Sequence, residues 1–86
     1  MPAIRPEKRS LTLHGHRTSV TLEAPFWEAL RRIAAREGMP VNRLVTQIDD
    51  ARDPGTSLAT AVRVHVLDWA LSNAAEHDGG PRRQAG

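Results

Sequence analysis

The sequence predicts a mainly helical domain that begins with a short β-ribbon. Two observations support this fold class. Polar and apolar residues alternate with a period of two over residues 8–13 and 17–22, which is typical of strands, and apolar residues then recur with helical spacing from residue 26. Prolines and glycines interrupt the helical pattern at Gly38-Met39-Pro40 and in the segment DDARDPGTS (49–57), which predicts three separate helices.

Length and composition limit the class of protein. The 86 residues are enough for one small domain, and so short a chain buries a limited core unless it oligomerises. The lack of cysteine excludes a disulfide framework and a thiolate site, and it favours a reducing compartment. No apolar run is long enough to cross a membrane, and the N-terminus does not resemble a signal peptide. We therefore expect a cytoplasmic protein.

Positive charge is concentrated at the N-terminus. Residues 1–17 hold four basic side chains and one acidic one, whereas residues 18–86 hold eight basic and nine acidic ones. Clustered basic charge attracts an anionic polymer, although a solvated basic tail has the same composition. Nucleic acid is therefore a candidate partner.

The strand elements come first in the chain. Residues 1–7 contain two prolines and predict a flexible arm, while residues 8–13 have the alternation of a short strand. The sequence leaves open whether residues 8–13 pair as a strand or remain part of the arm. His14-Gly15-His16 predicts a turn, because Gly15 is free to take a positive φ.

In the strand over residues 17–22, one face is apolar and the other is polar. Successive side chains point to opposite faces, so Val20 and Leu22 share one face, and the other carries Arg17, Ser19 and Thr21.

Three helices follow the strands. Pro25 suits the first turn of the first helix and Gly38 its end, and Pro40 suits the first position of the second. The third helix, about 57–75, is apolar on more than one face, which in so short a chain implies an oligomer interface. Residues 76–86 predict a disordered tail, which leaves a domain over residues 8–75. No internal repeat is evident.

A single strand needs a partner for its backbone hydrogen bonds. The most economical partner is the same strand of a second chain, which would give an intertwined homodimer with an intermolecular antiparallel ribbon. A two-stranded ribbon fits the major groove of DNA, where Arg17 can contact guanine and the hydroxyls of Ser19 and Thr21 can donate or accept.

The segment RTSVTLEAPFWEALRRIAAREGMPVNRLVTQI (17–48) resembles a ribbon-helix-helix domain, the class of the Arc and methionine repressors. The wider string over residues 8–71 resembles a bacterial subfamily of short ribbon-helix-helix proteins, here with an extra C-terminal helix. The resemblance implies a homodimer that binds double-stranded DNA sequence-specifically, associates with the nucleoid when bound, and regulates transcription, for example as a repressor.

The resemblance also assigns roles by position. Bases would be read by Arg17, Ser19 and Thr21, and a phosphate would bind the backbone amides that begin the second helix, at Val41, Asn42 and Arg43. This chain has Met39-Pro40 where relatives often have a Ser or Thr cap, and the missing Pro40 amide would weaken that phosphate site. Further phosphate contacts are expected from the basic N-terminal residues Lys8 and Arg9 and from His16.

Other interpretations remain open. Residues 40–50 resemble the recognition helix of a helix-turn-helix, although that segment ends in two aspartates. The broad apolar third helix also fits a protein-interaction module, such as an antitoxin-like adaptor dimer that binds a partner protein. His14 and His16 are too few to form a metal site in one chain. The sequence contains no coherent catalytic set, so we expect neither an enzyme nor a cofactor.

Overall fold

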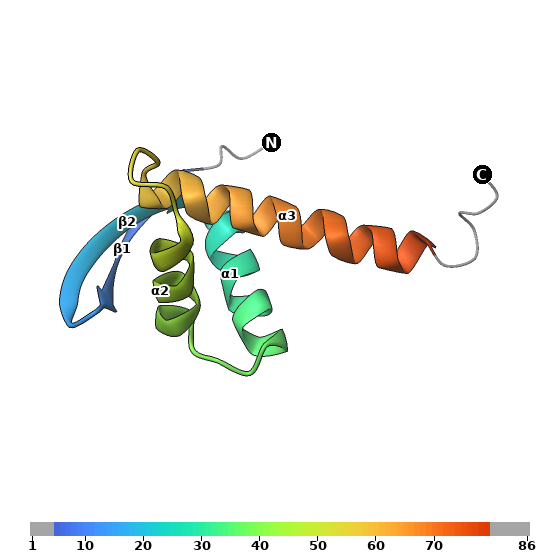
Figure 1. The fold of residues 1–86 in the computed structure, drawn as a ribbon, viewed down its shortest axis with the longest axis horizontal. Coiled ribbons are helices and arrows are strands. Elements are labelled where there is room, and N and C mark those ends of the chain that lie inside the picture. Colours follow the sequence, from blue (N-terminus) through green and yellow to red (C-terminus); the bar gives the residue numbers. More distant parts are fainter. Residues whose placement is uncertain (1–4, 80–86) are drawn as a thin grey trace.

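The computed structural model describes residues 5–79, with side chains as far as residue 74. A two-stranded antiparallel sheet is followed by three helices (Figure 1). The predicted fold class, mainly helical with a short β-ribbon, is confirmed. The predicted arm and tail lie partly outside the described residues, which exclude 1–4 and 80–86. The elements are β1 (Pro6–Leu13), β2 (His16–Glu23), α1 (Ala24–Arg36), α2 (Val41–Ala51) and α3 (Leu58–Gly79).

The two strands form a hairpin within one chain. Pro6 pairs with Glu23 at its open end, and Leu13 pairs with His16 at the turn. His14 and Gly15 make the turn, with φ of 51° and 78°, the two positive values that a type I′ turn requires. Gly15 adopts this conformation without steric cost.

The ribbon that the structure shows is therefore intramolecular, and the predicted pairing of two chains is not shown. Residues 8–13 form a strand that gives β2 its hydrogen-bond partner, a role that the sequence analysis assigned to a second chain. A two-residue turn closes this pairing locally, which costs far less entropy than recruiting another molecule.

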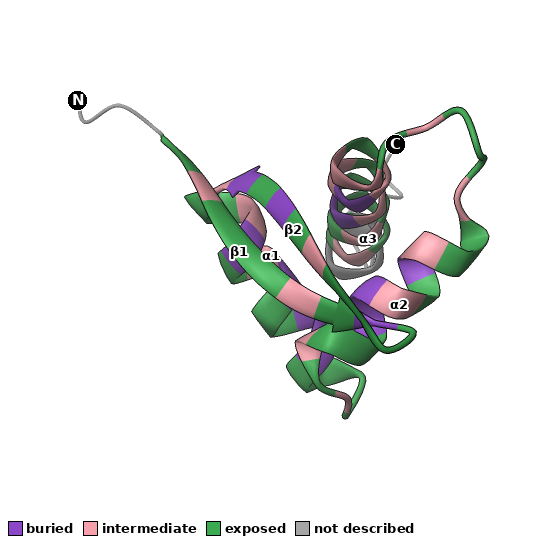
Figure 2. Cartoon of the chain, turned by 90° about the vertical axis from the view of Figure 1, so that its left-hand side faces the viewer, coloured by how far each residue is buried: buried purple, intermediate pink, exposed green. Residues whose placement is uncertain are grey.

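The faces of β2 are those that alternation predicted. Val20 and Leu22 are buried, whereas Arg17, Ser19 and Thr21 are exposed. Figure 2 shows buried and exposed bands alternating along β2. The hairpin thus has an inner face against the helices and an outer face that no described element covers.

The inner face of the hairpin and all three helices share one hydrophobic core. The α3 helix lies across one end of α1 and α2 and extends beyond them (Figure 1). Each helix contributes fully buried side chains to a single cluster, among them Leu30 and Ile33 of α1, Leu44 and Val45 of α2, and Val62 of α3. The hairpin and the three helices therefore pack as one unit within the chain.

The helix boundaries largely follow the glycines and prolines in the sequence. Gly38, with φ of 69°, ends α1, and Met39 N donates to the Ala34 carbonyl oxygen at 3.0 Å. Pro40 is the N-cap of α2, so the helix begins at Val41, one position later than predicted. The α3 helix continues past residue 75 to Gly79. No described helix is long and apolar enough to span a membrane.

Truncation of Leu30 tests this shared core. Leu30 is fully buried (0 % exposed), so Leu30→Ala should lower the free energy of unfolding by about 2–5 kcal/mol, measured by chemical denaturation. The neighbouring exposed Arg31 provides the control, because Arg31→Ala should change the same quantity by no more than about 0.5 kcal/mol. Equal losses in the two variants would contradict the packing described here.

Candidate nucleic-acid interface

The outer face of the β1–β2 hairpin is a continuous polar surface. Directly opposed residues of an antiparallel pair point to the same face, and three such pairs lie on this one between the turn and the Pro6–Glu23 pair at its open end. All six side chains are exposed, and they carry two positive charges and no negative charge. They are Lys8 opposite Thr21, Ser10 opposite Ser19, and Thr12 opposite Arg17.

This outer face contains the three predicted base-reading residues. It brings Arg17, Ser19 and Thr21 together, and it adds Ser10 and Thr12 of β1, which the sequence analysis did not single out. The alternation of residues 8–13 already indicated that Ser10 and Thr12 share one face. They were given no role in base reading because it was open whether this segment pairs as a strand. Lys8, expected only at phosphates, lies among the same six side chains.

Arg9 and His16 lie elsewhere. Arg9 is opposite Val20, on the inner face, where its Nη2 donates to Glu7 Oε1 at 2.7 Å and its guanidinium lies 5.2 Å from the centre of the Trp27 ring. Trp27 Nε1 in turn donates to the Glu7 carbonyl oxygen at 2.9 Å. Arg9 thus helps to fasten β1 to α1. His16 is exposed at the turn, where alternation also places it on the inner face.

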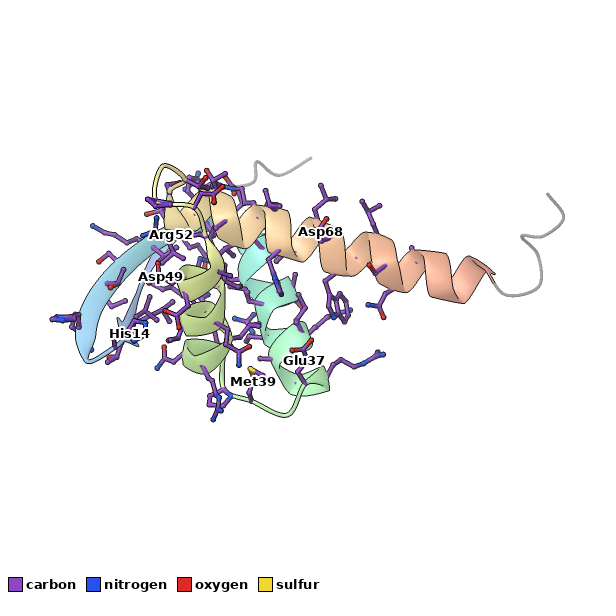
Figure 3. All side chains as sticks on the ribbon, viewed as in Figure 1. His14, Glu37, Met39, Asp49, Arg52 and Asp68 are labelled. Carbon is purple, nitrogen blue, oxygen red and sulfur yellow. The ribbon has the colours of Figure 1, made fainter. Side chains whose placement is uncertain are left out.

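The turn of the hairpin is fastened to α2. His14 Nε2 and Asp50 Oδ1 lie 2.7 Å apart, and Figure 3 shows His14 and Asp49 on the facing elements. Ligand atoms of His14, Asp49 and Asp50 lie within 4.8 Å of one another, and this group does not include His16. Asp49 also accepts a hydrogen bond from Arg52 Nε at 2.7 Å. These contacts form a link that orients the hairpin.

The start of α2 offers free backbone donors. Val41 and Asn42 occupy its first turn, where amides have no carbonyl partner within the helix. The Arg43 amide instead donates to the Pro40 carbonyl oxygen at 3.0 Å, so two of the three predicted amides remain available. Asn42 and Arg43 are exposed there. The Arg43 side chain adds positive charge to an end that already favours anions.

At the open end of the hairpin, Glu23 binds α3. Arg63 Nε donates to Glu23 Oε1 at 3.0 Å and Arg63 Nη2 donates to Glu23 Oε2 at 3.2 Å, a bidentate pair. The backbone amide of Glu23 itself, and then the Arg63 guanidinium, hold the pKa of the Glu23 carboxyl below its usual value. Alternation places Glu23 at the open end of the outer face, so the pairing with Arg63 offsets a negative charge there.

Comparisons with known proteins agree with this architecture. A family described as "Ribbon-helix-helix domain" matches residues 6–70. Among solved structures, the chain is similar to an uncharacterized protein from Bordetella pertussis Tohama I, at 36% sequence identity and a TM-score of 0.74. The alignment covers 85% of this chain and 62% of that one, so the chain spans less than two thirds of its relative. No curated protein matches the chain.

The pair between Glu23 and Arg63 should make stability depend on acidity. The pKa of Glu23 is lower in the folded protein than in the unfolded chain. The charged Glu23 therefore contributes to stability above the unfolded pKa near 4.5, and this contribution is lost as the pH falls through the lower folded pKa. Glu23→Gln should therefore lower the melting temperature at pH 7, and the gap to the parent should narrow in acid. Melting curves of both proteins between pH 7 and pH 3 measure this difference in melting temperature. A difference that does not change with pH would show that the charge of Glu23 does not contribute to stability.

Proposed function

We propose that this chain, which belongs to the ribbon-helix-helix domain family, is a sequence-specific DNA-binding protein that regulates transcription by placing the β1–β2 hairpin in the major groove. The family implies DNA binding. The observation that carries the finer proposal is the outer face of the hairpin, where six exposed polar side chains lie on two paired strands.

The dimensions of the hairpin support this proposal. Paired strands lie about 4.8 Å apart, and the major groove is about 12 Å wide, so a two-stranded ribbon enters it with its side chains. Arg17 can donate two hydrogen bonds to guanine O6 and N7, and the hydroxyls of Ser19 and Thr21 suit several bases. The absence of an acidic side chain among the six means that none of them repels phosphate.

Phosphate contacts would fix the orientation of the hairpin on the duplex. The free amides of Val41 and Asn42 and the side chain of Arg43 form an anion site of the kind that helix N-termini provide. Such contacts add affinity without sequence preference, and they make binding fall steeply with salt. The alternative in which α2 itself reads bases has weaker support, because Asp49 and Asp50 at its far end would approach phosphates.

We further propose that the protein is a homodimer joined through α3. Val64, Leu67 and Leu71 are 52, 56 and 59% exposed and lie in one stripe at spacings of three and four residues. The stripe is almost symmetric about Leu67. If α3 of a second copy packed on it antiparallel, Val64 of each chain would contact Leu71 of the other. Because the hairpin forms within each chain, such a dimer would carry two ribbons, one per subunit.

The same stripe supports a second candidate function, an adaptor that binds a different protein through α3. Grooves flank Val64 on both sides, one lined by Phe26 and Leu67 and the other by Ile48 and His65. A partner helix could occupy either groove. The self-matching spacing of the stripe leads us to favour a second copy of this chain.

Removal of the Arg17 side chain tests base reading. Arg17→Ala should weaken binding to a selected DNA site by about 1–3 kcal/mol and relax base preference, measured by fluorescence anisotropy on matched and mismatched duplexes. Arg32→Ala removes the same charge from α1, where the side chain is 76% exposed, and should leave base preference intact. Unchanged affinity and preference in Arg17→Ala would rule out hairpin reading.

A charge placed in the stripe tests the α3 dimer. Leu67→Asp should convert a dimer to single chains in sedimentation analysis, because an unpaired carboxylate cannot be buried in an apolar interface. Ser72→Asp places the same charge on an exposed residue outside the stripe and should leave the dimer intact. Parent protein that sediments as a single chain would refute the proposed dimer.

A further inference from the structure

The two strands of the hairpin carry the same short sequence. Residues 8–13 read KRSLTL and residues 17–22 read RTSVTL, nine positions further on. Ser, Thr and Leu are identical at the third, fifth and sixth positions, the first is basic in both, and the fourth is a branched aliphatic residue in both. No internal repeat is evident from the sequence alone. This one is visible in the structure, which pairs the two segments with each other.

The register makes the repeat symmetric in space. Ser10 lies directly opposite Ser19, and a two-fold axis between them exchanges the two antiparallel strands. This axis relates each residue of β1 to the residue nine positions later. On the outer face it relates Lys8 to Arg17, Ser10 to Ser19, and Thr12 to Thr21. The six outer side chains are thus two copies of one basic–Ser–Thr triplet.

The inner face follows the same symmetry. Leu13 and its counterpart Leu22 are both buried, and so is Val20, whose counterpart Leu11 is half-buried against the core. Arg9 and Thr18 are the one related pair whose chemistry differs, and Arg9 is the residue that binds Glu7 and lies over Trp27. The symmetry is therefore broken where β1 is attached to α1.

We propose that each chain carries a complete, nearly two-fold reading ribbon, and that this ribbon recognises a nearly palindromic DNA site, with Lys8 and Arg17 reading its two halves. The proposal rests on the proposed function. It differs from reading by strands of two chains, because here one chain supplies both triplets. It also changes the role expected for Lys8, from a phosphate contact to a base contact equivalent to that of Arg17.

The width of the groove favours one hairpin over a larger sheet. If the free edges of two β2 strands paired, the sheet would contain four strands, and its outer strands would lie about 14 Å apart before side chains are added. That exceeds the groove width of about 12 Å. A two-stranded hairpin fits within that width with both of its strands, so the residues of β1 can face DNA together with those of β2.

The positions of the two cations predict the layout of the site. Lys8 and Arg17 are four residue steps apart along the ribbon, about 13 Å at the rise of a strand. With about 3.4 Å per base pair, the two contacts are separated by roughly four base-pair steps. Both cations pair best with guanine O6 and N7, so we expect guanines on opposite strands at the two ends of a short palindrome.

The test is a selection from duplexes with a random core of about one helical turn, too short for two ribbons side by side. The full chain, Lys8→Ala, Arg17→Ala and Lys8→Arg are compared, with Arg32→Ala as the charge control. We expect Arg17→Ala to relax preference in one half of the site and Lys8→Ala in the other, each with about a tenfold loss of affinity for the parent site. Lys8→Arg makes the triplets identical and should make the selected site more palindromic.

The possible outcomes separate the inference from the proposed function. If Arg17→Ala relaxes both halves while Lys8→Ala weakens all sequences equally, two β2 strands read the site; the inference fails and DNA binding stands. If neither alanine variant changes preference, hairpin reading fails. If the parent chain shows no salt-sensitive binding, both proposals fall. Lys8 and Arg17 are exposed, so the melting temperatures of their variants should match the parent and exclude unfolding as the cause.

Discussion

The two-residue turn at His14-Gly15 is the constraint on which the rest of the structure depends. Both residues have positive φ, and together they set the register that places Leu13 opposite His16. A shift of one residue would move every side chain of β1 to the opposite face. It would then expose Leu11 and Leu13 and direct Lys8, Ser10 and Thr12 into the core. The core and the outer polar face are therefore consequences of the same turn.

Polar contacts at both ends then fix the hairpin on the helices. At the turn, His14 contacts Asp50 at 2.7 Å, and at the open end Glu23 forms a bidentate pair with Arg63. Between these ends, Trp27 Nε1 donates to the Glu7 carbonyl oxygen and is itself buried beneath Arg9. Exposed ion pairs contribute little to stability individually. Their effect here is on orientation, because they restrain the ribbon relative to α1, α2 and α3.

Local patterns in the sequence predicted much of this arrangement. The faces of β2, the end of α1 at Gly38 and the division into three helices each follow from the spacing of neighbouring residues. The partner of β2 could not be predicted in the same way. The backbone N–H and C=O groups of a strand require a partner strand, but they do not determine which chain provides it. Arg9 was assigned by its charge alone, whereas its position opposite Val20 places it on the inner face. Pairing information, which alternation does not contain, was needed in both cases.

The single-chain hairpin has a consequence for how its surface can change. In a ribbon built from two identical chains, every substitution appears twice, and the surface remains strictly symmetric. Here β1 and β2 are separate stretches of one sequence, so each can mutate alone. The difference between Lys8 and Arg17 is one that a ribbon of identical strands cannot contain. A duplicated strand can thus adapt to an asymmetric target one half at a time, with the backbone that presents it unchanged.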